Sequence, residues 1–238
     1  MTRITFGNWL RQAVVLIVRA PLVWAGYTLF IGILFSIGRV SLALGVFLSV
    51  TCLFVGVGVA KYIDLKSAAE TSVSFCWTVR RSLPLAILAA SSIVLCWFVF
   101  RIVANIYSGE IYKISQFFFY WDIRSENLDD KSMHQIAGWI YSSAMVTLLF
   151  VLLMLTTFAS WFSYPLMLFK NYSWSQAKER GTKASSENDA AMYKLLAFVF
   201  AAVLIGAGVM PLLTPVLYML VSTLMYVSYK AVFESTRS

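Results

Sequence analysis

The stretch "LLAFVFAAVLIGAGVMPLLTPVLYMLVSTLMYVSY", residues 195–229, contains no charged side chain. A bilayer core of roughly 30 Å is crossed by about 20 helical residues, so this run is too long for one straight span. Pro211 and Pro215 lie at its middle, and proline interrupts a helix because it lacks an amide N–H and clashes with the preceding turn. We therefore predict two spans, about 195–211 and 215–232, joined by a tight turn. One long, proline-kinked helix is the alternative.

Four further windows also lack charged residues: 20–38, 40–60, 82–100 and 135–169. The first three each have the length of one span. The fourth has no internal break before Pro165, and for it we predict one span at about 144–168. The segment in front of this span, "QIAGWIYSS", is expected to lie at the membrane interface, where tryptophan and tyrosine are enriched. The sequence thus predicts six spans.

The composition agrees with a membrane protein. Hydrophobic residues make up 60% of the chain and charged residues 13%, and the mean hydropathy is +0.78. Soluble domains contain about 45–50% apolar and about 25% charged residues. A soluble chain of this size has too little polar surface to cover so many apolar side chains. We predict an all-α integral membrane protein.

Two segments place an arginine and a proline directly ahead of an apolar run: "LIVRAPLVWAGYTLF" (16–30) and "TVRRSLPLAILAASS" (78–92). Amphipathic segments at 3–20, 61–81 and 173–194 are expected to be interfacial helices on the cytoplasmic surface, because basic side chains lie among lipid headgroups while their stems cover apolar surface. Proline is tolerated in the first helical turn, so each proline is expected to begin a span. The basic residues expected at the membrane interface include Arg11, Arg19, Arg80 and Arg81.

These elements predict three units, each consisting of a cytoplasmic interfacial amphipathic helix followed by a hairpin of two spans. The units are 1–60, 61–168 and 169–238, and together they form a single membrane domain, residues 1–238. The middle unit carries an external insertion at about 105–138. Internal repeats of this kind are common in membrane proteins.

Loop charge predicts the orientation. With the N-terminus inside, fourteen of the nineteen basic residues fall in cytoplasmic segments. Because lysine and arginine near span ends are enriched on the cytoplasmic side, both termini are expected in the cytoplasm of a bacterial cell, with the spans in its inner membrane. We therefore interpret the net charge of +8 as a consequence of the membrane topology. No nucleic-acid partner is expected, since none of the loops is long enough to form a binding domain.

Motifs for catalysis are missing from the sequence. His134 is the one histidine, which excludes paired-histidine zinc sites within the chain. Neither a G-x-x-x-x-G-K-[ST] phosphate loop nor a G-x-S-x-G nucleophile elbow occurs. Asp129 and Asp130 read as a solvated acidic loop rather than a cation site. We expect a protein that is not an enzyme and that holds no cofactor.

The predicted spans also offer little for ion-coupled transport, which usually requires ionisable groups at mid-membrane. Arg101 lies about 17 residues after Pro84, roughly 25 Å of helix, which places it at the outer interface. Small and hydroxyl residues are the usual material of helix contacts in lipid, and we expect packing contacts at those found here: Gly45, Gly56, Gly58, Ser91, Ser92, Thr147, Thr156, Thr157, Ser160, Gly206 and Gly208.

The least generic stretch is an aromatic run in the external insertion, followed by the acidic segment "DIRSENLDD". Five adjacent aromatic residues beside a membrane are most often an interfacial anchor. The other interpretation is a surface that docks a partner. The candidate partner-binding residues are Phe117, Phe118, Phe119, Tyr120 and Trp121.

Several segments resemble a known group of proteins. "WLRQAVVLIVRAPLVWAGYTL", "LGVFLSVTCLFVGVG", "SYPLMLFKNYSWSQA" and "PVLYMLVSTLMYVSYKAVF" are similar to a broad family of uncharacterised six-span bacterial inner-membrane proteins. That family is itself similar to the membrane region attached to some glycerophosphodiester phosphodiesterases. The resemblance covers most of the chain except 105–138. It implies a fold and a location, and it supplies no catalytic residue.

The leading functional hypothesis is a non-enzymatic inner-membrane protein that binds other integral membrane proteins, as an accessory, assembly or interaction subunit of a larger complex. The lipid bilayer is its other expected partner. A membrane-embedded carrier for lipid or another hydrophobic substrate is the alternative from a different class. A pore subunit or immunity-like protein is a third.

Overall fold

The computed structural model describes residues 5–37, 41–67, 74–109 and 132–234. Within these ranges the secondary structure is helical, without a strand. The helices are, in chain order, α1 (Phe6–Arg19), α2 (Pro21–Ser36), α3 (Leu42–Ser67), α4 (Phe75–Tyr107), α5 (Met133–Thr157), α6 (Ser163–Lys170), α7 (Trp174–Glu187), α8 (Asp189–Val209), the 3₁₀ turn η4 (Pro211–Leu213) and α9 (Thr214–Phe233).

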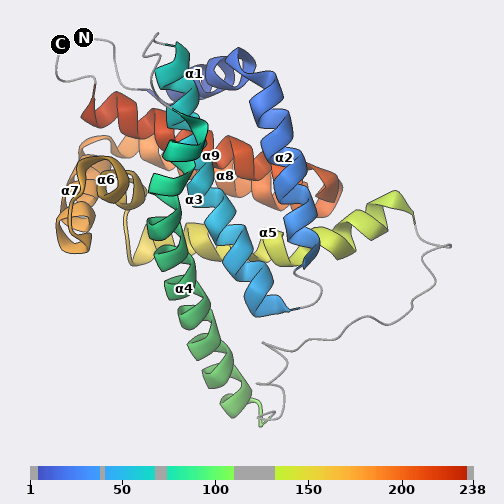
Figure 1. The fold of residues 1–238 in the computed structure, drawn as a ribbon. Helices are drawn as coiled ribbons and strands as arrows, with labels where there is room; N and C mark the ends of the chain where they lie inside the picture. Colours follow the sequence, from blue (N-terminus) through green and yellow to red (C-terminus); the bar gives the residue numbers. More distant parts are fainter. Residues whose placement is uncertain (1–4, 38–40, 68–73, 110–131, 235–238) are drawn as a thin grey trace.

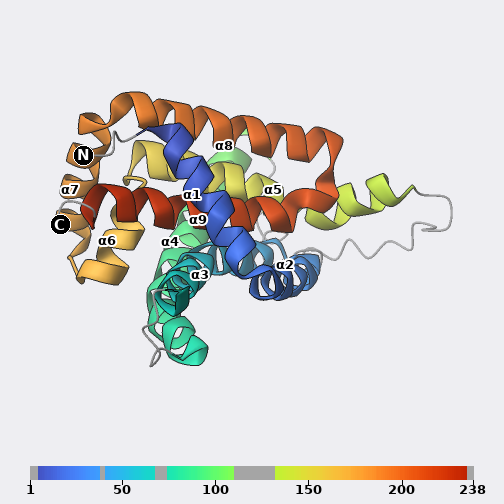
Figure 2. The same cartoon turned by 90° about the horizontal axis from the view of Figure 1, so that it is seen from above.

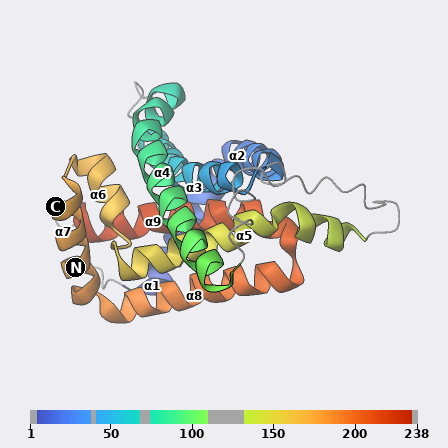
Figure 3. The ribbon, with the colours of Figure 1, turned by 90° about the horizontal axis from the view of Figure 1, so that it is seen from below.

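The long helices form two groups that cross each other (Figure 1). Helices α2, α3 and α4 make up one group, and α5, α8 and α9 run side by side in the other. Seen from above, α1 lies obliquely across α9 and reaches from α8 towards α2 (Figure 2). The short helices α6 and α7 cover one end of the second group (Figure 3). The result is two crossed helical layers with α3 and α9 in contact where they meet.

Five helices in the described residues are long and apolar enough to cross a membrane: α3, α4, α5, α8 and the segment Pro211–Phe233 that contains α9. The pair α1 and α2 gives a sixth candidate, bent by 94° at Ala20. Helix α2 has 16 residues, or about 24 Å of length, which is short for a bilayer core of roughly 30 Å. The fold is therefore compatible with a multi-pass membrane protein of five or six spans.

Within each group, neighbouring helices alternate in direction. In Figure 1, α3 runs opposite to α2 and α4, and α8 runs opposite to α5 and α9. The described chain begins and finishes at the upper-left end, near α1 and the end of α9.

The centre of the fold is the contact between α3 and α9, the two most buried candidate spans. Four residues of α9 spaced by four, Tyr218, Ser222, Tyr226 and Lys230, lie on one side of that helix, because residues four apart stack on one helical face. Tyr218 donates to the carbonyl of Ala144 on α5 at 2.7 Å. The Ser222 hydroxyl lies 2.8 Å from the carbonyl of Leu53 on α3. These side chains thus connect α9 to α5 in its own layer and to α3 in the other layer.

Gly56 makes the close approach of α3 and α9 possible. A Cβ atom at this position would lie 2.5 Å from the Ser222 Oγ and 2.5 Å from the Tyr27 hydroxyl oxygen. The Tyr27 hydroxyl itself donates to the carbonyl of Cys52 at 2.7 Å, which joins α2 to α3. Small residues let helix backbones approach in lipid, as predicted for Gly56. Three helices thus meet at a position without a side chain.

The predicted division of residues 195–229 into two helices is confirmed. Helix α8 ends at Val209, η4 turns the chain at Pro211, and α9 begins at Thr214 with Pro215 in its first turn. The separate helix ahead of Pro21 is confirmed as α1, and Pro21 is the first residue of α2. Ala20 is the hinge residue between them, with non-helical backbone angles. A helix is also confirmed within 173–194, where α7 begins with a capping box made by Ser173 and Gln176.

The separate surface helix predicted at 61–81 is wrong. Residues 61–67 continue α3, and residues 75–81 are the first turns of α4, which runs on through Pro84. The reason is tertiary packing: Thr78 and Ser82 are buried, and the Ser82 Oγ lies 2.9 Å from the Cβ position of Gly58 on α3. This contact holds the start of α4 in line with its apolar part, where neighbouring groups can compensate for the amide that proline lacks.

The fourth span also differs from its prediction of about 144–168. Helix α5 is continuous from Met133, where Ser132 and Gln135 form a capping box, and it ends at Thr157. The chain then turns, because Ser160 lies against Gly181 of α7, with its Oγ 2.7 Å from the position of a glycine Cβ. Residues 163–170 form the separate helix α6, which finishes at Asn171 in the left-handed conformation. The segment of α5 that is apolar enough to cross a membrane is Ile140–Thr157, so the predicted span begins about four residues late and ends about eleven residues late.

Gly56→Ala tests the α3–α9 contact. We expect the added methyl group to lower the apparent melting temperature in detergent, because overpacking a tight contact costs about 1–3 kcal/mol. Gly26→Ala on α2 is the matched control, since nothing lies within 4 Å of its Cβ position. Thermal unfolding followed by circular dichroism makes the comparison, and equal stability of the two variants would contradict the packing described here.

Candidate functional site

The polar stripe of α1 faces a cavity. The helix begins at Thr5, whose side chain accepts a hydrogen bond from the Asn8 amide at 3.4 Å. On one side, Trp9, Ala13 and Leu16 are buried against the rest of the protein. Residues three and four apart share a helical face, and such a row lines the cavity: Asn8, Arg11, Gln12, Val15 and Arg19.

The cavity lies between α1 and the ends of α3 and α9, and its volume is about 660 Å³. That is the size of a small-molecule site, which is usually about 300–1,000 Å³. Helix α3 contributes Asp64, and α9 with the residue after it contributes Tyr226, Lys230 and Glu234. The cavity therefore collects charged groups from three elements that are distant in the sequence.

Asp64 is the organising side chain of this cavity. One oxygen of its carboxylate, Oδ2, accepts a hydrogen bond from the Tyr226 hydroxyl at 2.7 Å and forms an ion pair with the Lys230 ammonium group. The Asp64 side chain is 16% exposed and that of Lys230 47%. Beside it, Ser67 donates to the Asp64 carbonyl at 2.7 Å and accepts from Arg19 at 3.4 Å. The charge of Asp64 is thus matched by Lys230.

The remaining charges of the cavity are two guanidinium groups and one carboxylate. Arg11 and Arg19 come from α1, and Glu234 follows α9. With the Asp64–Lys230 pair neutralised, one positive charge remains in excess. The arrangement offers several N–H donors to an anionic group in a pocket at the end of the helices.

Trp9 forms a buried part of the cavity wall. This side chain lines the cavity and is 1% exposed. Its indole nitrogen is buried and has no hydrogen-bond partner among the described residues. Because the protein covers this nitrogen, Trp9 contributes apolar wall to the cavity and not an accessible donor.

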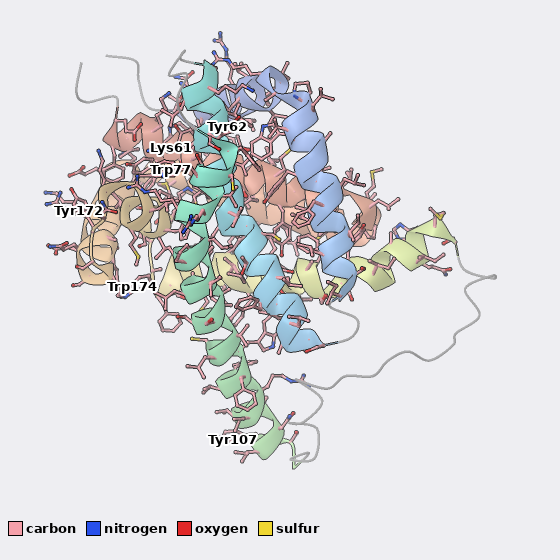
Figure 4. The ribbon with its side chains drawn as sticks, in the orientation of Figure 1. Lys61, Tyr62, Trp77, Tyr107, Tyr172 and Trp174 are labelled. Atoms are coloured by element: carbon pink, nitrogen blue, oxygen red, sulfur yellow. The ribbon has the colours of Figure 1, made fainter. Side chains whose placement is uncertain are left out.

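The predicted interface residues fall into two places. Arg11 and Arg19 line the cavity. Arg80 and Arg81 lie in the first turns of α4 and are exposed, and the Arg81 guanidinium is 5.4 Å from the centroid of the Trp77 ring. Trp77 lies at the same end of the molecule as Lys61 and Tyr62 of α3 (Figure 4). The candidate partner-binding residues Phe117, Phe118, Phe119, Tyr120 and Trp121 lie outside the described residues.

The group formed by Asp64, Tyr226 and Lys230 was not predicted from the sequence. A signal was available in part, because Tyr226 and Lys230 are four residues apart and so share a face of the last helix. The carboxylate that they contact comes from 162 and 166 residues earlier in the chain. Nothing in local spacing reveals a contact over such a separation.

Two further contacts join α6 to α3 and to α4. The Lys61 ammonium group lies 4.1 Å from the centroid of the Phe169 ring on α6, a distance at which a cation and an aromatic face attract. Tyr164 of α6 donates to the Ser82 carbonyl of α4 at 3.4 Å. Burial raises the pKa of the Tyr164 hydroxyl above its usual value, so this group stays protonated and keeps its donor role.

Among the described residues, no three His, Cys, Asp or Glu side chains come together to form a metal site. Comparison of the chain with protein families, curated proteins and solved structures finds no match.

Asp64→Leu tests the organising role of the carboxylate. We expect a loss of about 1–3 kcal/mol, because the substitution leaves the Tyr226 hydroxyl without its acceptor. Adding Tyr226→Phe should recover part of that loss, since removing both partners of a buried hydrogen bond can be nearly neutral. Melting temperatures of the two single variants and the double variant provide the measurement. A double variant as unstable as the sum of the single ones would refute the Asp64–Tyr226 contact.

Proposed function

We propose that this chain is a non-enzymatic, multi-pass protein of the bacterial inner membrane that acts as an accessory or interaction subunit of a larger membrane complex. Its termini lie on the cytoplasmic side in this proposal. The resemblance to six-span inner-membrane proteins, which rests on sequence motifs, is consistent with this location. One structural observation supports the interaction role most directly, the exposure of α4.

Helix α4 is the least covered of the candidate spans. Of its most apolar segment 11% is buried, compared with 67% for α3 and 78% for the segment that contains α9. It packs mainly on α3, through Ser82, Ala86 and Ala90. A further contact joins Trp97 to Phe150 of α5, with ring centroids 5.1 Å apart. Beyond this point α4 projects past the other helices (Figures 1 and 3).

Lipid alone could cover an apolar helix face, but α4 also carries polar groups that lack partners. The Nε atom of Arg101 and the amide nitrogen of Asn105 are buried and have no hydrogen-bond partner in the structure. They lie four residues apart, on one face of the projecting part of the helix. Lipid tails offer no acceptor, and an unpaired donor in hydrocarbon is costly. Because this chain itself covers both atoms, they indicate a polar environment at this end of α4 rather than a surface that faces lipid tails.

The aromatic run Phe117–Trp121 follows α4 in the chain and stays a predicted part of the same partner surface. Aromatic side chains commonly dominate the energetics of protein interfaces when they fill pockets on a partner. In this proposal, α4 and the aromatic run act together at the external end of the molecule.

The distribution of charge supports the proposed orientation. Twelve of the thirteen described basic residues lie near the end of α3, the start of α4, the α1–α9 cavity or α7, and Arg101 near the end of α4 is the exception. Cytoplasmic span ends are enriched in lysine and arginine. The twelve are Arg11, Arg19, Lys61, Lys66, Arg80, Arg81, Lys170, Lys178, Arg180, Lys183, Lys194 and Lys230. Tyr172 and Trp174 lie beside α7, and Tyr107 lies at the far end of α4 (Figure 4), and aromatic residues are enriched at both membrane interfaces.

A carrier for a hydrophobic substrate is the second candidate, favoured by an apolar groove of about 350 Å³ between α8 and α9. Its lining includes Phe198, Gly206 and Leu217, and it shares no lining residue with the charged cavity. At the close α3–α9 packing around Gly56, buried hydroxyls are used in contacts between helices rather than in lining a path. This packing favours the interaction role over transport.

Reporter fusions test the orientation. A reporter fused after Ser238 should be active only in its cytoplasmic format, and one inserted near Asp129 only in its external format. The expected result follows from the distribution of basic residues, because lysine and arginine are enriched at cytoplasmic span ends. A C-terminal fusion active only outside would reverse the proposed topology.

Photo-crosslinking in intact cells tests α4 as a partner surface. A photoreactive amino acid at Leu95 or Phe100 should give discrete protein adducts, because both positions are exposed on α4. Leu204 and Ile205 of α8, which are exposed to a similar degree, are matched controls and should give lipid adducts alone. Identical adduct patterns on α4 and α8 would show that α4 faces lipid, which would remove the main support for an interaction role.

A further inference from the structure

We propose that the charged cavity between α1, α3 and α9 is a binding site for a phosphate group, supplied by the headgroup of an anionic phospholipid or by free phosphate. This site lies away from α4, so the inference goes beyond the interaction role and does not depend on it. Three features of the cavity carry it: unused donors, a charge excess and an adjoining apolar surface.

The first feature is the set of donors not engaged in strong contacts. Within the described part of the chain, no hydrogen bond or ion pair holds the guanidinium of Arg11. Arg19 makes one long contact, 3.4 Å to the Ser67 hydroxyl, which leaves most of its donors available. Guanidinium groups suit phosphate well, because their planar array of N–H donors matches its oxygens in pairs.

The second feature is charge. Of the two carboxylates in the cavity, Asp64 is paired with Lys230 and also accepts from Tyr226. Glu234 balances the charge of one arginine in the sum of the lining charges, although no ion pair joins it to either arginine in the described residues. The other arginine is uncompensated, which favours a ligand with a single negative charge, such as a phosphodiester. Arg11 and Arg19 lie eight residues apart on α1, about 12 Å along the helix, so they can contact opposite sides of one headgroup.

The third feature distinguishes a lipid from a small soluble anion. Val15 lines the cavity and is partly exposed, and Val18 and Leu22 next to it are strongly exposed. Val15 and Val18 are three residues apart on α1, so an exposed apolar strip adjoins the cavity wall on this helix, and Leu22 adds apolar surface beyond the bend at Ala20. A phospholipid could place its phosphate in the cavity and its acyl chains on this strip, whereas inorganic phosphate would leave the strip uncovered. The structure thus favours the lipid as the source of the phosphate.

The test uses the full chain in detergent and three forms of it: wild type, Arg11→Gln/Arg19→Gln, and Arg80→Gln/Arg81→Gln. The last pair is a matched control, because it removes the same charge from exposed positions at the same end of the molecule but outside the cavity. Melting without ligand verifies that each form is folded. Native mass spectrometry then measures retention of phosphatidylglycerol and of zwitterionic phosphatidylcholine, and thermal shift measures stabilisation by inorganic phosphate against chloride at equal ionic strength.

We expect wild type to retain one phosphatidylglycerol in preference to phosphatidylcholine. Arg11→Gln/Arg19→Gln should weaken that retention by about ten-fold or more, since basic residues near the membrane surface contribute strongly to anionic-lipid binding. The control pair should stay within about two-fold of wild type. Stabilisation by inorganic phosphate that depends on Arg11 and Arg19, without lipid retention, would retain the site and identify a soluble phosphate as its ligand.

Two outcomes would overturn the site. Equal loss of lipid in the two double variants would show general charge attraction rather than a cavity. Binding of lipid and phosphate unaffected by the loss of Arg11 and Arg19 would show that neither ligand occupies the cavity. Neither result bears on the photo-crosslinking of α4, so the site and the interaction role can fail separately.

Discussion

The absence of a side chain at Gly56 is the constraint on which the rest of the structure depends. It lets α3 and α9 approach until the Ser222 hydroxyl reaches the Leu53 carbonyl, and it admits the Tyr27 hydroxyl from α2 at the same point. In lipid the hydrophobic effect does not drive helices together, so close packing and hydrogen bonds between helices must hold the fold. Further along α9, the same row of residues reaches Asp64 and organises the charged cavity. The core and the candidate site are therefore two parts of one helix contact.

Features that depend on local chemistry were predictable from the sequence. Long runs without charged residues predicted the positions of the apolar helices. Pro211 and Pro215 correctly predicted that the last run is divided into two helices. Pro21 marked the break between α1 and α2. Pro84 led to the wrong prediction of a helix boundary, because α4 continues through this proline. The helix is continuous there because Thr78 and Ser82, which precede Pro84, pack on α3 at Gly58. A single sequence does not reveal such a contact between distant residues.

The candidate site was predictable only to the extent that one helix defines it. The polar stripe of α1 with Arg11 and Arg19 follows from helical periodicity, and it lines the cavity. The sequence suggested that this stripe would meet lipid headgroups directly, whereas in the structure it faces α9 across a hollow. Asp64 joins the site through a contact with α9 over 162 residues, and for that reason its role could not be inferred from spacing. The predicted function in protein association still rests on α4 and on the aromatic run.

The central position of α9 has a consequence for how the protein is made. The Ser222 hydroxyl and the Leu53 carbonyl that it contacts are 169 residues apart. A ribosome adds about 5–20 residues per second, so α3 waits on the order of ten seconds or more for its partner to be synthesised. During that interval the surfaces of the earlier helices that α9 later covers, including the Leu53 carbonyl, stay open. Assembly of this fold is thus a late event, because its central contact forms only after α9 has been synthesised.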